Sequence, residues 1–280
     1  MGSVLGFLKK HVFEIVFGLA FAAGICLMLY PTVSNWWNER HTTKVVSGYD
    51  DAIKVMAPDE IEARLVEAYV YNDRLRSNPD RLYPDEEAMA EYMSILDVDG
   101  NGVMGYIEIP VISVKLAIYH TVEEKYLQIG AGHQQGTSLP VGGAGTNCFI
   151  SGHRGLPSSK LFSDLDKVNI GDIFRITVLG QTLTYQVDKI DVVLPDKTAD
   201  ALVIRSGEDT VTLVTCTPYG VNTHRLLVRG SRIETPDDYL LGGAGDAELV
   251  NTVFQSLVIA TVLYALAIAV IMLRRKLLYG

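Results

Sequence analysis

Cys216 ends a predicted strand, at a place where a thiol can act as a nucleophile. Residues 210–216 alternate in the manner of a strand, and Pro218 ends it because proline has no backbone N–H to donate. A second strand pattern begins at residues 225–229. Pairing of the two strands sets Cys216 opposite Arg225, with their backbones about 5 Å apart. The pattern therefore predicts a thiol and a cation at the mouth of one loop.

This pair of side chains suits attack on a carbonyl group. A free thiol has a pKa of about 8.5, and a nearby cation favours the thiolate, which is the nucleophilic form. Arg225 can instead donate to the oxyanion that forms when a carbonyl is attacked. Arg229 lies on the same strand face by period two and is the rival for either role.

Proton transfer at such a site needs a histidine, and His153 has the best context of the six in the chain. It stands in a glycine-bounded turn just after a predicted strand, where a rigid scaffold can present an imidazole. Spacing alone leaves simpler interpretations open, in which Cys216 packs in the core and His153 and Arg225 are solvated. Cys148 lies inside an apolar strand and is expected in the core.

The composition of the 280 residues excludes several classes of protein. The chain has 24 Lys and Arg against 33 Asp and Glu, and its net charge of -9 has the wrong sign for binding nucleic-acid phosphates. The three cysteines are too few and too scattered for a disulfide framework, and no Cys/His cluster has the spacing of a zinc site. The cysteines therefore predict neither a disulfide framework nor a zinc site.

Two apolar runs stand near the ends of the chain. Residues 12–30 and residues 253–273 are each long enough to span a membrane. Lysines precede the first run and Arg274, Arg275 and Lys276 follow the second, so the positive-inside rule places both termini in the cytoplasm and the middle outside the cell. Two alternatives stay open: the first run as a cleaved signal peptide, and the second as a buried core helix.

Between the two runs the pattern changes from helical to extended. Helical spacing covers residues 58–76 and a shorter stretch after Pro84, separated by a polar linker at 77–83. Beyond residue 97 the chain reads as short strands typical of an all-β barrel or sandwich. The expected strands are 103–109, 113–119, 147–151, 173–179, 182–194, 211–216 and 225–233, with a further one around 202–205 and a tight hairpin turn at 179–181.

At this point the motifs resemble a known family. Thr212-Leu213-Val214-Thr215-Cys216 followed by Arg225 resembles the catalytic motif of sortases. The stretch from about residue 96 to 233 resembles class C, pilus-assembling sortases, through NGVMGYIEIP at 101–110, GTSLPVGG at 136–143, SGHRGLPSSKLFSDLD at 151–166 and TLVTCTPYGVNTHRLLVRG at 212–230. Membrane segments at both ends also match that class.

The resemblance implies a mainly β fold: a closed β-barrel of about eight strands, with an N-terminal helical lead-in and a transmembrane helix at each end. It also implies a cysteine transpeptidase that cleaves an LPxTG-like sorting signal between Thr and Gly. Cys216 is then the nucleophile that forms a thioacyl-enzyme, His153 the general acid/base, and Arg225 the group that holds substrate and oxyanion. A lysine amine of a neighbouring pilin resolves the intermediate, on the outer face of the cell membrane. By the same resemblance, no metal and no organic cofactor is needed.

The resemblance also sets the expected layout of the chain. It comprises a cytoplasmic flank and membrane helix (1–30), an extracellular helical lead-in (31–96), a catalytic barrel (97–234), a linker (235–252), a second membrane helix (253–273) and a basic cytoplasmic tail (274–280). Pilus sortases commonly carry a lid with an Asp-Pro-aromatic tripeptide, which is missing here. Residues 77–85 are therefore expected to form a cover of different chemistry, or none.

Three alternatives to pilus assembly follow from the same residues. A sortase that attaches proteins to a peptidoglycan amine shares the first half-reaction and differs only in the acceptor. A non-catalytic, membrane-held binding protein would tolerate loss of Cys216. A papain-type hydrolase is disfavoured, because its nucleophile precedes its histidine in the chain, whereas here His153 precedes Cys216.

Overall fold

The computed structural model describes residues 2–236, and the compact unit that holds the strands ends at Glu234. The predicted second membrane helix, residues 253–273, lies outside the described residues, as does the basic tail. Among residues 2–236, a single helix is long and apolar enough to cross a membrane, judged by length and composition: the stretch Val16–Val55, with a mean hydropathy of 2.0 in its most apolar window.

The first helix, α1 (Gly2–Val55), runs well past the predicted apolar segment of residues 12–30. Its continuation is amphipathic: Val46, Tyr49 and Ile53, spaced three and four residues apart, are all buried. The Tyr49 hydroxyl donates to the Met104 carbonyl at 3.0 Å and accepts from a backbone N–H of the barrel at 2.8 Å. The helix continues because its second half has the barrel to pack on.

Two further helices complete the lead-in, as predicted. They are α2 (Pro58–Ser77) and α3 (Glu86–Ser94), and the Asp85 side chain caps α3 by accepting from the Ala88 N–H at 2.9 Å. On α2 the apolar Tyr69 is exposed, whereas the polar Asn72 is buried. Asn72 exchanges two hydrogen bonds with the backbone of Leu139, which fixes α2 to the barrel.

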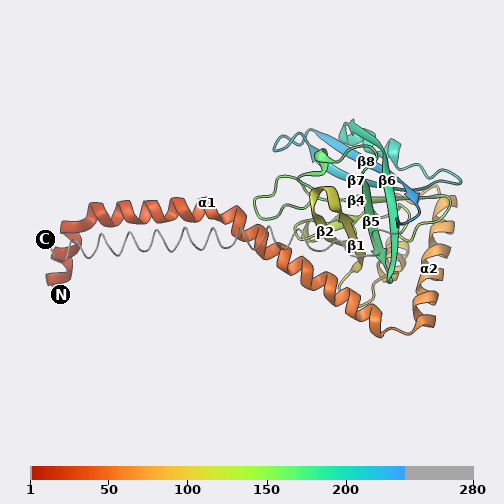
Figure 1. Cartoon of the computed structure of the whole chain (residues 1–280), viewed down its shortest axis with the longest axis horizontal. Coiled ribbons are helices and arrows are strands. Elements are labelled where there is room, and N and C mark those ends of the chain that lie inside the picture. Colours follow the sequence, from red (N-terminus) through yellow and green to blue (C-terminus); the bar gives the residue numbers. More distant parts are fainter. Residues whose placement is uncertain (1, 237–280) are drawn as a thin grey trace. The chain divides into compact units, whose positions relative to one another are not determined.

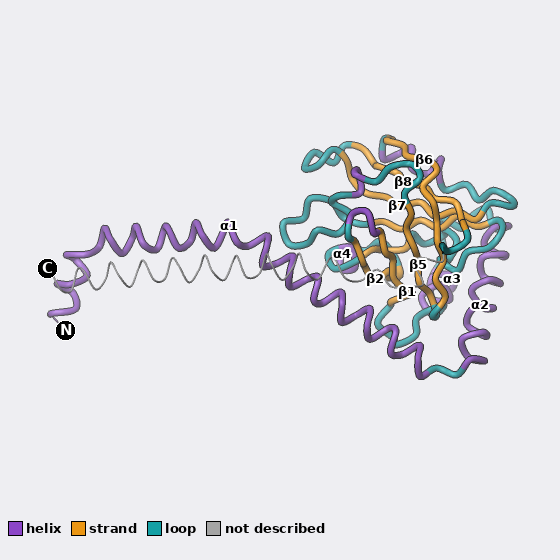
Figure 2. The backbone as a smooth tube through the Cα atoms, in the orientation of Figure 1, coloured by secondary structure: helices purple, strands orange, loops and turns teal. Residues whose placement is uncertain are grey.

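Eight strands form a closed barrel in the order β1-β2-β3-β4-β7-β8-β6-β5. The strands are β1 (Val103–Ile109), β2 (Val114–His120), β3 (Ala131–His133), β4 (Thr146–Ser151), β5 (Ile173–Val178), β6 (Gln181–Val193), β7 (Asp209–Thr217) and β8 (His224–Ile233). They pack together in Figure 1, and Figure 2 shows α1 and α2 outside them. This confirms the mainly β barrel with a helical lead-in.

Short helices link some of the strands. They are α4 (Glu124–Leu127), between β2 and β3, and the 3-10 turns η1 (Pro110–Ile112), η2 (Leu165–Lys167) and η3 (Pro195–Ala201). The predicted hairpin turn joins β5 to β6, where Leu179 and Gly180 have φ of 47° and 77°. Positive φ at both turn residues matches the right-handed twist of the two strands.

The structure corrects the expected strands at two places. The strand predicted at 202–205 is a loop. The Asn147 side-chain amide donates to the carbonyls of Ala201 and Val203 at 2.9 and 3.0 Å, whereas in a strand the backbone N–H groups of a neighbouring strand would bind such carbonyls. The three-residue strand β3 was not predicted. It includes Gly132, where an added Cβ would lie 2.4 Å from the Thr121 carbonyl oxygen. The strand therefore depends on a glycine that lets its backbone lie close to the backbone of Thr121, and its sequence has no apolar pattern.

The turn before β1 has the spacing of a calcium-binding loop but a different structure. Residues 97–108 fit the pattern Asp-x-Asp-x-Asn-Gly followed by a distal Glu. However, β1 is extended, so a rise of about 3.4 Å per residue carries Glu108 roughly 20 Å beyond Gly102. Glu108 instead pairs with Lys115 at 3.0 Å, and Asp97 accepts from the Gly102 N–H at 2.9 Å. The acidic residues here shape a turn.

Candidate active site

Cys216 and Arg225 are direct partners across β7 and β8, as the sequence predicts. Val211 and Leu213 belong to the barrel core, so the alternate residues of β7, including Val214 and Cys216, face outward. Cys216 is half-buried at the point where β7 gives way to the loop that leads into β8. The thiol is thus partly exposed at the end of the barrel, and the strand β7 holds its backbone in place.

The structure separates Arg225 from its rival Arg229. Arg229 is held by Asp188, to which its Nε and Nη2 donate at 2.9 and 3.1 Å, and this hydrogen bonding raises the pKa of Arg229. Arg225 donates only to backbone carbonyls, those of Asn222 at 3.4 Å and His224 at 3.2 Å. Within residues 2–236 Arg225 has no carboxylate partner, so its guanidinium remains available to a substrate.

His153 is brought to the same end of the barrel by β4. This strand lies parallel to β7, and the pairing extends one residue further through the Gly152 N–H, which donates to the Val214 carbonyl at 3.0 Å. The Thr215 hydroxyl donates back to the Gly152 carbonyl at 2.8 Å. A Cβ on Gly152 would lie 2.6 Å from the Phe162 ring, so glycine is required before His153. His153 and Cys216 therefore leave neighbouring strands side by side.

A carboxylate that the sequence did not single out contacts the His153 imidazole. Glu124, the first residue of α4, places its two oxygens 3.1 and 3.2 Å from His153 Nε2. Hydrogen bonds from Gln128 and then from His153 lower the pKa of the Glu124 carboxyl, and the charge of His153 adds to the effect. Glu124 lies in an exposed acidic run, and no local spacing distinguishes it from a solvated charge.

A small apolar cluster is buried on the outside of β7, the strand that carries Cys216. Phe149, Val214 and Leu227, on neighbouring strands, form a buried cluster separate from the barrel core. Ala201 and Leu202, from the connection between β6 and β7, pack against this cluster from the side. We call these five residues the apolar strip; Ala201 and Leu202 cover its three buried strand residues and so hold the connection between β6 and β7 against the barrel.

Comparison with known proteins identifies the family to which this fold belongs. A family model described as sortase domain matches residues 107–233, which include Cys216, His153 and Arg225. Sortase C1 of Streptococcus agalactiae is 46% identical, with a TM-score of 0.67, over 69% of this chain and 100% of that chain. This chain belongs to the sortase family.

Other relatives agree with that assignment. A pilus-related sortase C of Group B Streptococcus is 43% identical, with a TM-score of 0.59, and the match covers 66% of this chain and 95% of that chain. Sortase A of Bacillus anthracis is 27% identical over 227 residues, which are 81% of this chain and 97% of that protein. The chain is therefore a sortase transpeptidase, and its solved neighbours are sortases of class C.

Arg154 connects the two halves of the site in this sortase. Its side chain is only 7% exposed. One arm of the guanidinium donates to the Thr217 hydroxyl at 3.2 Å, and the other binds Asp166 in η2. The Tyr219 ring, in the loop between β7 and β8, lies 5.8 Å from the guanidinium carbon. Arg154, which follows His153, thus binds Thr217, which follows Cys216.

The linker between α2 and α3 docks on the loops that flank the apolar strip. Arg81 donates to the carbonyls of Gly136 and, at 2.6 Å, of Leu202. A Cβ on Gly136 would lie 2.2 Å from the Arg81 carbonyl oxygen, so glycine permits the contact, and burial lowers the pKa of Arg81. Among the described residues, no hydrogen bond or ion pair joins residues 78–85 to Cys216, His153 or Arg225.

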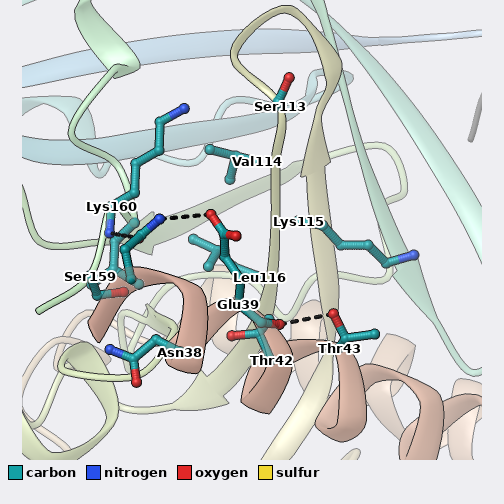
Figure 3. A pocket seen from close by; sticks show the side chains of 12 residues that line it. Asn38, Glu39, Thr42, Thr43, Ser113, Val114, Lys115, Leu116, Ser159 and Lys160 are labelled. Carbon is teal, nitrogen blue, oxygen red and sulfur yellow. Dashed lines mark hydrogen bonds between the residues drawn. The ribbon is translucent and has the colours of Figure 1, made fainter. Parts of the chain in front are cut away.

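A pocket of about 150 Å³ lies between α1, β2 and residues 159–161, away from the three predicted catalytic residues. In Figure 3 the amino groups of Lys115 and Lys160 point away from Asn38 and Thr42 in its wall. On one side of the pocket the Asn38 amide donates to the Ser158 carbonyl at 2.7 Å, and the Lys160 N–H donates to Asn35 at 2.7 Å. These bonds attach α1 to the loop that begins at His153.

Proposed function

We propose that this sortase assembles pili, with Cys216, His153 and Arg225 as its catalytic residues. The observation that carries the catalytic assignment is the register that sets Cys216 opposite Arg225, together with the bond between Gly152 and β7 that brings His153 alongside. The likeness to a pilus-related sortase C supports the pilus role over attachment to peptidoglycan.

In the first half-reaction the Cys216 thiolate attacks the threonine carbonyl carbon of an LPxTG-like sorting signal. Arg225 stabilises the oxyanion that forms, because a cation fixed beside the developing charge needs little reorganisation. The bond between Thr and Gly then breaks, and protonated His153 gives its proton to the leaving amine. The threonine acyl group stays on sulfur as a thioester.

In the second half-reaction a lysine amine of a neighbouring pilin attacks the thioester. His153, now neutral, takes a proton from this amine, the carbon–sulfur bond breaks, and the thiolate returns to Cys216. The product is an isopeptide bond between two pilin subunits.

We also propose that α1 anchors the enzyme with its barrel on the extracellular face of the membrane. Its apolar part has the required length, and the lysines before it indicate a cytoplasmic N-terminus. The domain layout follows: an anchor at 1–30, a lead-in at 31–96 and a catalytic barrel at 97–234, with the second membrane helix at 253–273.

An acceptor competition tests the pilus assignment. The full chain in detergent is mixed with an LPxTG peptide, a lysine-bearing pilin and a peptidoglycan stem peptide, and the products are separated by mass. We expect the sorting signal on the pilin lysine. A product on the stem peptide alone would select the cell-wall alternative, and absence of any product, including hydrolysis, would favour a non-catalytic protein.

A further inference from the structure

Glu124 is the charged side chain that the structure places directly on the proposed general acid/base. Both of its carboxylate oxygens lie within 3.2 Å of His153 Nε2. The side chain of Glu124 is 67% exposed and that of His153 is 26% exposed. The contact joins α4 to the turn after β4, two segments that are 29 residues apart in the chain.

The other charged groups near this site are engaged elsewhere. On α4, Lys125 pairs with Glu123 at 2.9 Å. On the His153 turn, the guanidinium of Arg154 binds Asp166 and Thr217. At the start of β8, Arg225 donates to backbone carbonyls, and Cys216 at the end of β7 is the proposed nucleophile. Within the described stretch of the chain, Glu124 is thus the charged residue bonded to the imidazole.

The chemistry of the contact assigns a proton. A carboxylate only accepts hydrogen bonds, so the imidazole nitrogen that faces it, Nε2, carries hydrogen. The second nitrogen, Nδ1, is then the one that gains and loses the catalytic proton.

We propose that Glu124 is a positioning residue that orients the His153 imidazole and keeps hydrogen on Nε2, so that Nδ1 is the nitrogen that exchanges the catalytic proton. This role rests on the proposed function of His153. It completes a Cys–His–carboxylate arrangement in which the third group acts through the histidine, as in other enzymes with an activated nucleophile. Because Glu124 is exposed, the effect is modest and is screened by salt.

The test compares Glu124→Gln with the neighbouring Glu123→Gln in the full chain in detergent. Glu123 is the matched control because it is also an exposed acid but pairs with Lys125. We measure kcat/KM for cleavage of an LPxTG peptide against pH. In Glu124→Gln we expect kcat/KM to fall about two- to fivefold. In nitrogen NMR spectra of the His153 ring we expect the neutral imidazole to carry its hydrogen on Nε2 in the wild type, and the two tautomers to be mixed in Glu124→Gln.

Two further variants separate this role from a structural one. Glu124→Asp retains the carboxylate and is expected to keep kcat/KM and the ring tautomer closer to those of the wild type. Gln128→Ala removes the hydrogen bond that Gln128, at the end of α4, donates to Glu124, and leaves the carboxylate beside His153. Added salt reduces the difference between wild type and Glu124→Gln if the effect is electrostatic.

The outcomes distinguish failure of this role from failure of the proposed function. If the wild type and Glu124→Gln both form the thioester and agree in kcat/KM and in the tautomer of the His153 ring, the role of Glu124 is wrong and the transpeptidase mechanism stands. An equal loss of kcat/KM in Glu123→Gln or in Gln128→Ala would also overturn it. If the wild type forms no thioester with the peptide, both proposals fail together.

Discussion

At the residue scale, the chemistry of this sortase depends on environments that differ among residues of one type. Cys148 is 2% exposed, and burial raises its thiol pKa well above the usual value, so it is inert at neutral pH. Cys216 is half-buried opposite an arginine. The two arginines of β8 are likewise separated by their partners, because Asp188 holds Arg229 and leaves Arg225 to the site.

Substitution of the two arginines tests this difference. We expect Arg225→Ala to lower kcat by about 100- to 1000-fold, the usual effect of removing one oxyanion donor, with little change in thermal stability. Arg229→Ala removes an ion pair with a partly exposed carboxylate and is expected to cost about 0.2–1 kcal/mol while leaving kcat near wild type. Steady-state kinetics and urea unfolding measure both. Equal losses of kcat in the two variants would contradict the assignment.

The residues of the site were partly predictable from the sequence. Cys216 and Arg225 could be placed opposite each other because period two and Pro218 set the strand end and the loop. Glu124 could not be found, because its contact with His153 depends on how α4 is carried between β2 and β3. Long-range contacts of this kind have no local signature.

At the element scale, single side chains hold the loops around Cys216. Arg154 is the clearest case, since it joins the turn after β4 to the end of β7. We expect Arg154→Lys, which keeps the charge and loses the planar fork, to slow thioester formation by about 10- to 100-fold through misplacement of His153. Arg205→Lys, in an exposed pair with Glu208 at 3.7 Å, is the control. Stopped-flow acylation would show no difference between the two variants if Arg154 only contributes to stability.

Arg81 performs a similar task for the connection between β6 and β7. Arg81→Ala removes the hydrogen bonds to Gly136 and Leu202, and we expect faster amide hydrogen exchange at residues 195–208 and a higher KM for the sorting-signal peptide. Arg74→Ala, whose partner Glu91 is exposed, is the control. Unchanged exchange at residues 195–208 in Arg81→Ala would show that Arg81 does not hold the connection between β6 and β7 in place.

A buried histidine makes the contact between α3 and the barrel sensitive to pH. His133 accepts from the Tyr92 hydroxyl at 2.8 Å, and burial lowers its pKa from 6.5 to about 4. A depressed pKa means that the unfolded chain binds the proton first, so this stability is present above pH 6.5 and is lost as pH falls toward 4. We expect the free energy of unfolding to drop by about 2 kcal/mol more in the wild type than in His133→Gln between pH 7 and pH 5. Parallel pH dependences in urea unfolding would contradict this.

The sequence predicted most elements but missed those without an apolar pattern of their own. The other seven strands and helices α2 and α3 lie within a residue or two of their expected bounds, because each buries one face. The short strand β3 follows from a glycine that lets two backbones approach, and the loop at 202–205 from side-chain bonds of Asn147. Neither cause produces a hydrophobic period.

At the scale of the whole described unit, α1 connects the predicted anchor to the active site. The helix runs without a break from its apolar half to the half that packs on the barrel, and Asn35 and Asn38 bind the loop that begins at His153. The sequence indicated the apolar half from composition alone. The half of α1 that packs on the barrel was not predicted, because it has few apolar residues and these are buried only by contact with the barrel.

This connection leads to a prediction for the anchored enzyme. We expect the double variant Asn35→Ala, Asn38→Ala to increase hydrogen exchange at residues 153–164 and to lower the acylation rate, since two hydrogen bonds to that loop are lost. Asn35 also donates to Glu39, so Glu39→Gln serves as a control for changes within α1 itself. Wild-type hydrogen exchange at residues 153–164 in the double variant would show that α1 does not stabilise the loop that begins at His153.

The most direct test of the central claim is intact-mass spectrometry of the full chain in detergent, mixed with an LPxTG peptide, beside Cys216→Ala. We predict an adduct that carries the peptide without the residues after threonine, located on Cys216 and absent from the variant. An adduct that persists in Cys216→Ala, or a wild-type chain that forms none, would contradict the assignment of Cys216 as the nucleophile of a transpeptidase.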